Sequence, residues 1–190
     1  MNTLNLKKVF LLTLITALSL SALIGIFIFL FGSFGDLESK ILFTTLTIGA
    51  YSLTALCCGA LYDKHKYLVF SMIGITISAI GFLLTLAVIW QRLMLTDITI
   101  WKTLIIFVIL SGSFAHASLL LLIKSKSIAV NVSLYLTLLF ISLVALTLIF
   151  LIIMELSSID QIWYRILGVW AILDVLGTII TPIILKVVSN

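Results

Sequence analysis

The chain has little charge, a single proline and no polar stretch long enough to form a soluble domain. Charged residues make up 9% of its 190 residues, whereas hydrophobic residues make up 63% and the mean hydropathy is +1.39. Because a soluble domain carries about 25% charged residues, a water-soluble globular fold is excluded. The composition predicts an all-α polytopic integral membrane protein in which residues 1–190 form a single transmembrane domain.

The sequence also lacks the motifs of the common catalytic and metal sites. It has no phosphate-binding loop, dinucleotide fingerprint, His-Glu-x-x-His motif or nucleophile elbow. Its two cysteines, Cys57 and Cys58, are adjacent in an apolar run, so on a helix they point in directions about 100° apart and favour neither a disulfide nor a metal site. We therefore expect no catalytic residues, no metal and no cofactor, which disfavours an enzyme without excluding one.

The net charge of +4 does not indicate a nucleic-acid partner, because no basic tract is present. Most of the lysine excess flanks apolar runs, where cations orient helices and meet anionic lipid headgroups. The expected partners are membrane lipids, together with other membrane subunits or further copies of the chain.

Six windows of about 20 apolar residues predict six membrane-spanning helices. They cover residues 9–31, 41–62, 67–90, 101–123, 128–154 and 163–185. The first resembles a signal peptide, with Lys7 and Lys8 ahead of an apolar run and small residues at Ser19 and Ser21. Since this run continues through Leu30, we expect it to remain as an uncleaved helix.

Charge asymmetry predicts the orientation of these helices. Six spans place both termini on one side of the membrane, and that side carries seven cations and one acid: Lys7, Lys8, Lys64, Lys66, Lys124, Lys126 and Lys186 with Asp63. The opposite side carries four cations and five acids: Lys40, Arg92, Lys102 and Arg165 with Asp36, Glu38, Asp97, Glu155 and Asp160. The positive-inside rule puts both termini in the cytoplasm, and the short loops favour a bacterial plasma (inner) membrane.

A short pattern recurs at the start of every second helix. Lys40-x-Leu42, Lys102-x-Leu104 and Arg165-x-Leu167 follow one another at spacings of 62 and 63 residues. This spacing suggests three parallel helical-hairpin repeats related by an axis along the membrane normal.

Asp174 is the one acidic residue that lies deep in an apolar run. A carboxylate at the centre of a membrane helix costs about 2.5–3.5 kcal/mol on insertion scales, so it usually has a partner or a function. His116 and Tyr51 fall at similar depth, and Thr178 shares a helix face with Asp174. We interpret Asp174, His116, Tyr51 and Thr178 as a candidate intramembrane polar site. Either the imidazole donates to the carboxylate, or Asp174 is protonated or bonded to hydroxyl groups and fixes helix packing.

Small and hydroxylated residues recur at three-to-four spacing on several helices, as in Gly74, Ser78 and Gly81, and such faces favour close helix packing. These faces support a non-enzymatic accessory, assembly or structural subunit. The alternative is a small proton- or ion-coupled transporter or channel that uses the Asp/His site. A membrane enzyme acting on lipid is the weakest hypothesis, because a second deep carboxylate is missing.

Overall fold

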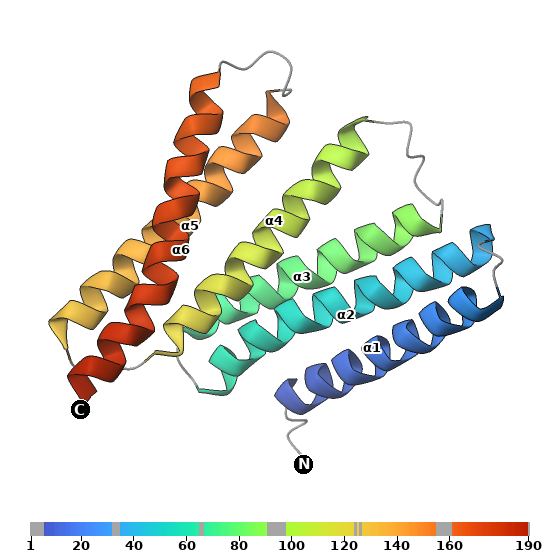
Figure 1. Cartoon of the computed structure of the whole chain (residues 1–190), viewed down its shortest axis with the longest axis horizontal. Helices are drawn as coiled ribbons and strands as arrows, with labels where there is room; N and C mark the ends of the chain where they lie inside the picture. The colour runs from blue at the N-terminus through green and yellow to red at the C-terminus, as the bar shows by residue number, and fades with distance from the viewer. Residues whose placement is uncertain are drawn as a thin grey trace. The chain divides into compact units, whose positions relative to one another are not determined.

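A computed structural model describes residues 6–31, 35–64, 67–90, 98–123, 125, 127–154 and 161–189 (Figure 1). Its elements are six α-helices, and these ranges contain no strand, which confirms the all-α class. The helices are α1 (Leu6–Phe31), α2 (Asp36–Asp63), α3 (Leu68–Ile89), α4 (Ile98–Leu121), α5 (Ile128–Ile153) and α6 (Gln161–Ser189).

Five of the helices, α2 to α6, are long and apolar enough to cross a membrane. In α1 the corresponding apolar stretch among the described residues is the shorter Leu11–Phe27. A backbone in lipid must pair its own polar groups, and helices of this length do so within one segment. The chain is therefore a multi-pass helical membrane protein, and a sixth span through α1 stays a prediction.

Helices α2 and α6 extend beyond the expected apolar windows at both ends, whereas α3 and α5 stay within theirs. Helix α2 begins at Asp36 rather than at residue 41, and its first turn carries Asp36 and Glu38, which favour the positive end of the helix dipole. Helix α6 continues through Pro182 to Ser189. Apolar windows detect only what lies in lipid, whereas backbone hydrogen bonding continues into the polar flanks.

Several residues on which the predicted orientation depends lie outside the described residues. They are Lys66, Arg92, Asp97, Lys124, Lys126, Glu155 and Asp160. In the described part, Lys40, Lys102 and Arg165 each stand four positions after the first residue of their helix, that is after Asp36, Ile98 and Gln161. The three helices thus share one starting pattern, and the hairpin repeat stays a prediction.

The described helices cluster into two compact units, Met1–Ser111 and Gly112–Asn190. In the first, α1 packs on α2 and α2 packs on α3; in the second, α5 packs along α6 (Figure 1). Helix α4 passes from one unit into the other. The single transmembrane domain therefore stays a prediction.

Small residues bring helices into close contact within each unit, as the sequence predicts. In the first unit, Gly74, Ser78 and Gly81 of α3 are buried, and a Cβ added at Gly81 would lie 2.9 Å from the Tyr51 ring of α2. In the second unit, a Cβ at Gly177 of α6 would collide with the Thr137 hydroxyl of α5. Only hydrogen fits at these two positions, which lets the neighbouring side chain pack directly on the glycine backbone.

We expect Gly177→Ala to destabilise the protein by about 1–3 kcal/mol, because the added methyl group overpacks the α5–α6 contact. Gly168→Ala is the matched control on the same helix, since a Cβ there meets nothing within 4 Å. Alanine favours a helix over glycine by about 0.8–1.0 kcal/mol, so the control variant should be neutral or more stable. Unfolding in mixed micelles, followed by circular dichroism, measures both; equal stability of the two variants would contradict the packing described.

Candidate intramembrane polar site

Asp174 lies on α6 in the second unit, with a half-buried side chain. Its Oδ1 atom is buried and has no hydrogen-bond partner in the part of the chain that the structure describes. The carboxyl group interacts electrostatically with His116, which lies on the part of α4 that belongs to the same unit. The expected hydrogen bond from the imidazole to the carboxylate stays a prediction.

The hydrogen bond of the imidazole is made to Thr178. The Thr178 hydroxyl donates to the backbone carbonyl of Asp174 at 2.9 Å, and the same oxygen lies 3.0 Å from His116 Nε2. A hydroxyl group has one proton, and here the backbone carbonyl takes it. His116 Nε2 then carries a hydrogen and donates it to Thr178.

Tyr51, the fourth residue of the predicted site, belongs to the first unit. Its hydroxyl is 3.2 Å from the Thr85 hydroxyl, and Thr85 donates its own proton to the Gly81 carbonyl at 2.8 Å. Because the single proton of Thr85 is already used in that bond, the Tyr51 hydroxyl is the donor to the Thr85 oxygen. Its ring packs edge-to-face on Phe82, with the centroids 6.1 Å apart. The structure thus unites Asp174, His116 and Thr178 in one site and places Tyr51 in a separate helix contact.

A second polar contact joins α5 to α6. Ser133 lies 2.8 Å from Thr181, whose hydroxyl donates to the Gly177 carbonyl at 2.7 Å, so Ser133 is the donor. Thr137 donates to the Ser133 carbonyl at 2.8 Å, and both Thr137 and Thr181 are fully buried. Sequence reasoning assigned no role to Ser133 and Thr137, although their spacing of four residues places them on one face of a helix.

One arrangement recurs in these three contacts between helices and in a fourth, between Trp90 and Thr44. A threonine donates its proton to the carbonyl four residues earlier, and its oxygen accepts a hydrogen from a neighbouring helix. The acceptor and donor pairs are Thr44 with Trp90, Thr85 with Tyr51, Thr178 with His116 and Thr181 with Ser133. We call Thr44, Thr85, Thr178 and Thr181 the threonine acceptors.

Comparison with protein-family models, with curated proteins and with solved structures found no match. Among the described residues, no group of three or more His, Cys, Asp or Glu side chains lies close enough together to hold a metal ion. The chemistry of the site therefore has to be argued from Asp174, His116 and Thr178 themselves.

We expect Thr178→Val to destabilise the second unit by about 0.6 kcal/mol, the average for a hydrogen bond between membrane helices. The variant keeps the shape of the side chain and removes the acceptor for His116. Thr147→Val is the matched control, because Thr147 donates to the Leu143 carbonyl and has no second partner in the described ranges. Reversible unfolding in bicelles measures both variants. A Thr178→Val cost no larger than that of the control would show that the His116 hydrogen bond adds nothing to stability.

We also expect neutral His116 to be protonated at Nε2, because only this tautomer donates to Thr178. Nitrogen-15 spectra of histidine-labelled protein in lipid, recorded where the ring is neutral, distinguish the two tautomers. The chain has two histidines, so in the His65→Gln variant the only histidine signals are those of His116. In Thr178→Val the preference should weaken; a ring protonated at Nδ1 in the wild type would contradict the assignment.

Proposed function

We propose that this protein is a non-enzymatic accessory or assembly subunit of a bacterial plasma membrane, and that it acts through helix packing. The observation that carries the proposal is the use of its intramembrane polar groups: hydroxyls, the imidazole and a tryptophan N–H bond neighbouring helices through the threonine acceptors. Such bonds hold helices together in lipid.

The geometry around Asp174 supports packing over transport. A proton relay from His116 to Asp174 through Thr178 needs the Thr178 hydroxyl to donate to the carboxyl group. That hydroxyl also donates to the backbone carbonyl of Asp174 at 2.9 Å, so its single proton is shared between the carbonyl and the carboxyl group, which weakens it as a relay. The buried Oδ1 also favours a structural group over one that exchanges protons with water. Asp174 and Thr178 thus fix the position of α4 against α6.

Helix α6 offers the surface through which a subunit would assemble. In its most apolar window 6% of the residues are buried, compared with 22% to 33% in the windows of α2 to α5. Its exposed aliphatic side chains recur at spacings of three and four residues, at Val169, Ile172, Leu176, Ile179 and Ile183. This spacing makes one continuous face of a helix, suited to packing against a second helix.

A proton- or ion-coupled transporter is the second candidate, and it rests on the electrostatic contact between Asp174 and His116. Intramembrane carboxylates and histidines serve as proton relays in transporters. For either function we propose six spans with both termini in the cytoplasm. The lysines around the predicted inner loops and the short connections support this topology.

Reconstitution in liposomes separates the two candidates. We expect liposomes with the wild-type chain to show the same proton leak as liposomes with Asp174→Asn, measured with an entrapped pH-sensitive dye under an imposed gradient. Mild extraction into native nanodiscs should give particles that contain more protein than one 21.0 kDa chain.

Two outcomes would contradict the assembly role. One is a proton flux that disappears in Asp174→Asn, which would establish transport. The other is a strictly monomeric chain in nanodiscs at native abundance. A double variant in which Trp replaces Leu176 and Ile183 tests whether the α6 face is the assembly surface. It should reduce the assembled fraction severalfold and leave helix content unchanged, whereas the same change at Leu136 and Leu139 of α5 should have a smaller effect.

A further inference from the structure

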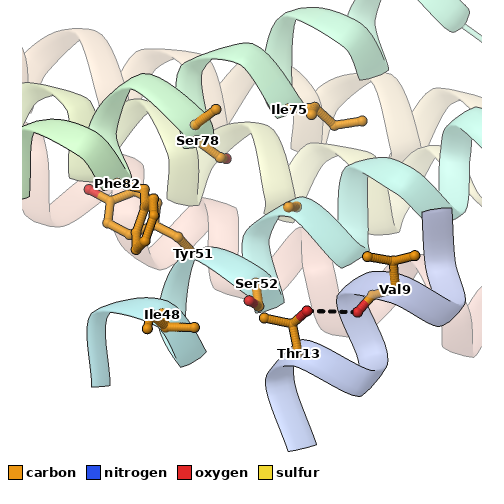
Figure 2. Close-up of a pocket in the computed structure, with 10 residues that line it drawn as sticks. Val9, Thr13, Ile48, Tyr51, Ser52, Ile75, Ser78 and Phe82 are labelled. Carbon is orange, nitrogen blue, oxygen red and sulfur yellow. Dashed lines mark hydrogen bonds between the residues drawn. The ribbon is translucent and has the colours of Figure 1, made fainter. Parts of the chain in front are cut away.

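A cavity of about 320 Å³ lies within the first unit, between α1, α2 and α3 (Figure 2). Its walls are mainly apolar: Val9 comes from α1, Ile48 and Ala55 from α2, and Ile75 and Phe82 from α3. Ligand sites start at about 300 Å³ and combine apolar walls with a few polar groups. The cavity is thus large enough for a small molecule or for part of a longer one.

The cavity lies at membrane depth. Ile48 is 12 residues after Asp36 and Ala55 is 8 residues before Asp63, the two ends of α2. At 1.5 Å per residue these separations are about 18 Å and 12 Å, which places the α2 side of the cavity near the middle of that helix, whereas Val9 on the α1 side is three residues after Leu6, where α1 begins. A molecule that enters from the surrounding bilayer is therefore mainly hydrocarbon.

One polar group in the cavity has no partner there. Ser52 of α2 lines the space and is 7% exposed, and no hydrogen bond joins its hydroxyl to the other side chains that line the cavity (Figure 2). The other hydroxyls that line the cavity are engaged. Tyr51 donates to Thr85, Ser78 accepts from Thr54 at 3.1 Å, and Thr13 donates to the Val9 carbonyl. A hydroxyl that faces an apolar space without a partner carries a free-energy cost, which a ligand oxygen would remove.

We propose that this cavity binds a neutral, mainly hydrocarbon molecule of the bilayer that presents one hydrogen-bonding oxygen to Ser52. The Tyr51 and Phe82 rings and the aliphatic side chains contact the hydrocarbon body, while the Ser52 hydroxyl pairs with a hydroxyl or carbonyl oxygen. A plain acyl chain would fill the same volume and leave Ser52 unpaired. The apolar walls disfavour an ionised headgroup, because burying a charge against them is costly.

The test compares ligands that differ by one oxygen. Dodecan-1-ol bearing a photoreactive diazirine is crosslinked to the full chain in nanodiscs, and labelled positions are identified by mass spectrometry. We expect labels on the segments that line the cavity, 48–55 and 75–82. Unlabelled dodecan-1-ol should compete roughly twofold to tenfold better than dodecane, the range expected for one net hydrogen bond.

Ser52→Ala should abolish this preference and leave competition by dodecane unchanged. Ser142→Ala is the matched control, because Ser142 is an exposed hydroxyl on α5, far along the chain, that donates to the Leu139 carbonyl. It should leave the preference intact. Dodecan-2-one separates two ligand chemistries. Competition equal to that of the alcohol assigns Ser52 as the donor to a carbonyl or quinone type of oxygen, whereas preference for the alcohol identifies a lipid alcohol.

Three results would overturn the proposal. Dodecane that competes as well as the alcohol would make the cavity a site for ordinary acyl chains. Labels spread over exposed positions of α3 such as Val69 and Met72 would indicate partition into lipid without a site. A preference for the alcohol that survives in Ser52→Ala would show that Ser52 does not recognise the oxygen. The readout does not depend on Asp174 or α6, so it is independent of the assembly role.

Discussion

The proton of a threonine hydroxyl is the constraint on which the contacts between these helices depend. In lipid no water is present to satisfy a side chain, so in four of these contacts the threonine gives its single proton to the carbonyl one turn earlier, whereas Thr54 also donates to Ser78 of the neighbouring helix. In those four contacts the oxygen is then only an acceptor, and the neighbouring helix must supply a donor. Trp90, Tyr51, His116 and Ser133 each do so. Every such contact has a fixed direction, which sets both the rotation of the helix and the tautomer of His116.

The sequence was sufficient to predict the helices because the bilayer sets their length and the apolar windows show it directly. The helix ends were less predictable, since residues such as Asp36 and Glu38 favour a helix start for electrostatic reasons that hydropathy does not measure. Burial of Gly74, Ser78 and Gly81 also followed from their spacing. The arrangement of helices into two clusters had no such signal, because apolar helices of similar composition do not specify their neighbours.

The sequence predicts which residues form the candidate site more readily than it predicts the hydrogen bonds between them. Depth along a helix and a shared face brought Asp174, His116 and Thr178 together. Depth alone also suggested Tyr51, but two residues at equal depth on different helices need not meet. That His116 bonds Thr178, and not the carboxyl group, depends on side-chain geometry and on a proton count that residue spacing does not contain. The unpaired Ser52 hydroxyl likewise depends on how three helices pack around it.

The contact between Gly177 and Thr137 links two positions that are 40 residues apart in the chain. Because the Thr137 side chain occupies the space where a Cβ at position 177 would lie, the two sites share one fixed volume. A larger residue on α6 is acceptable only together with a smaller one on α5, so changes at the two positions are expected to be compensatory. Homologous chains should therefore vary at these positions in a correlated way. A small residue at the position of Gly177, paired with a small or a larger residue at the position of Thr137, would identify the same helix contact in a divergent sequence.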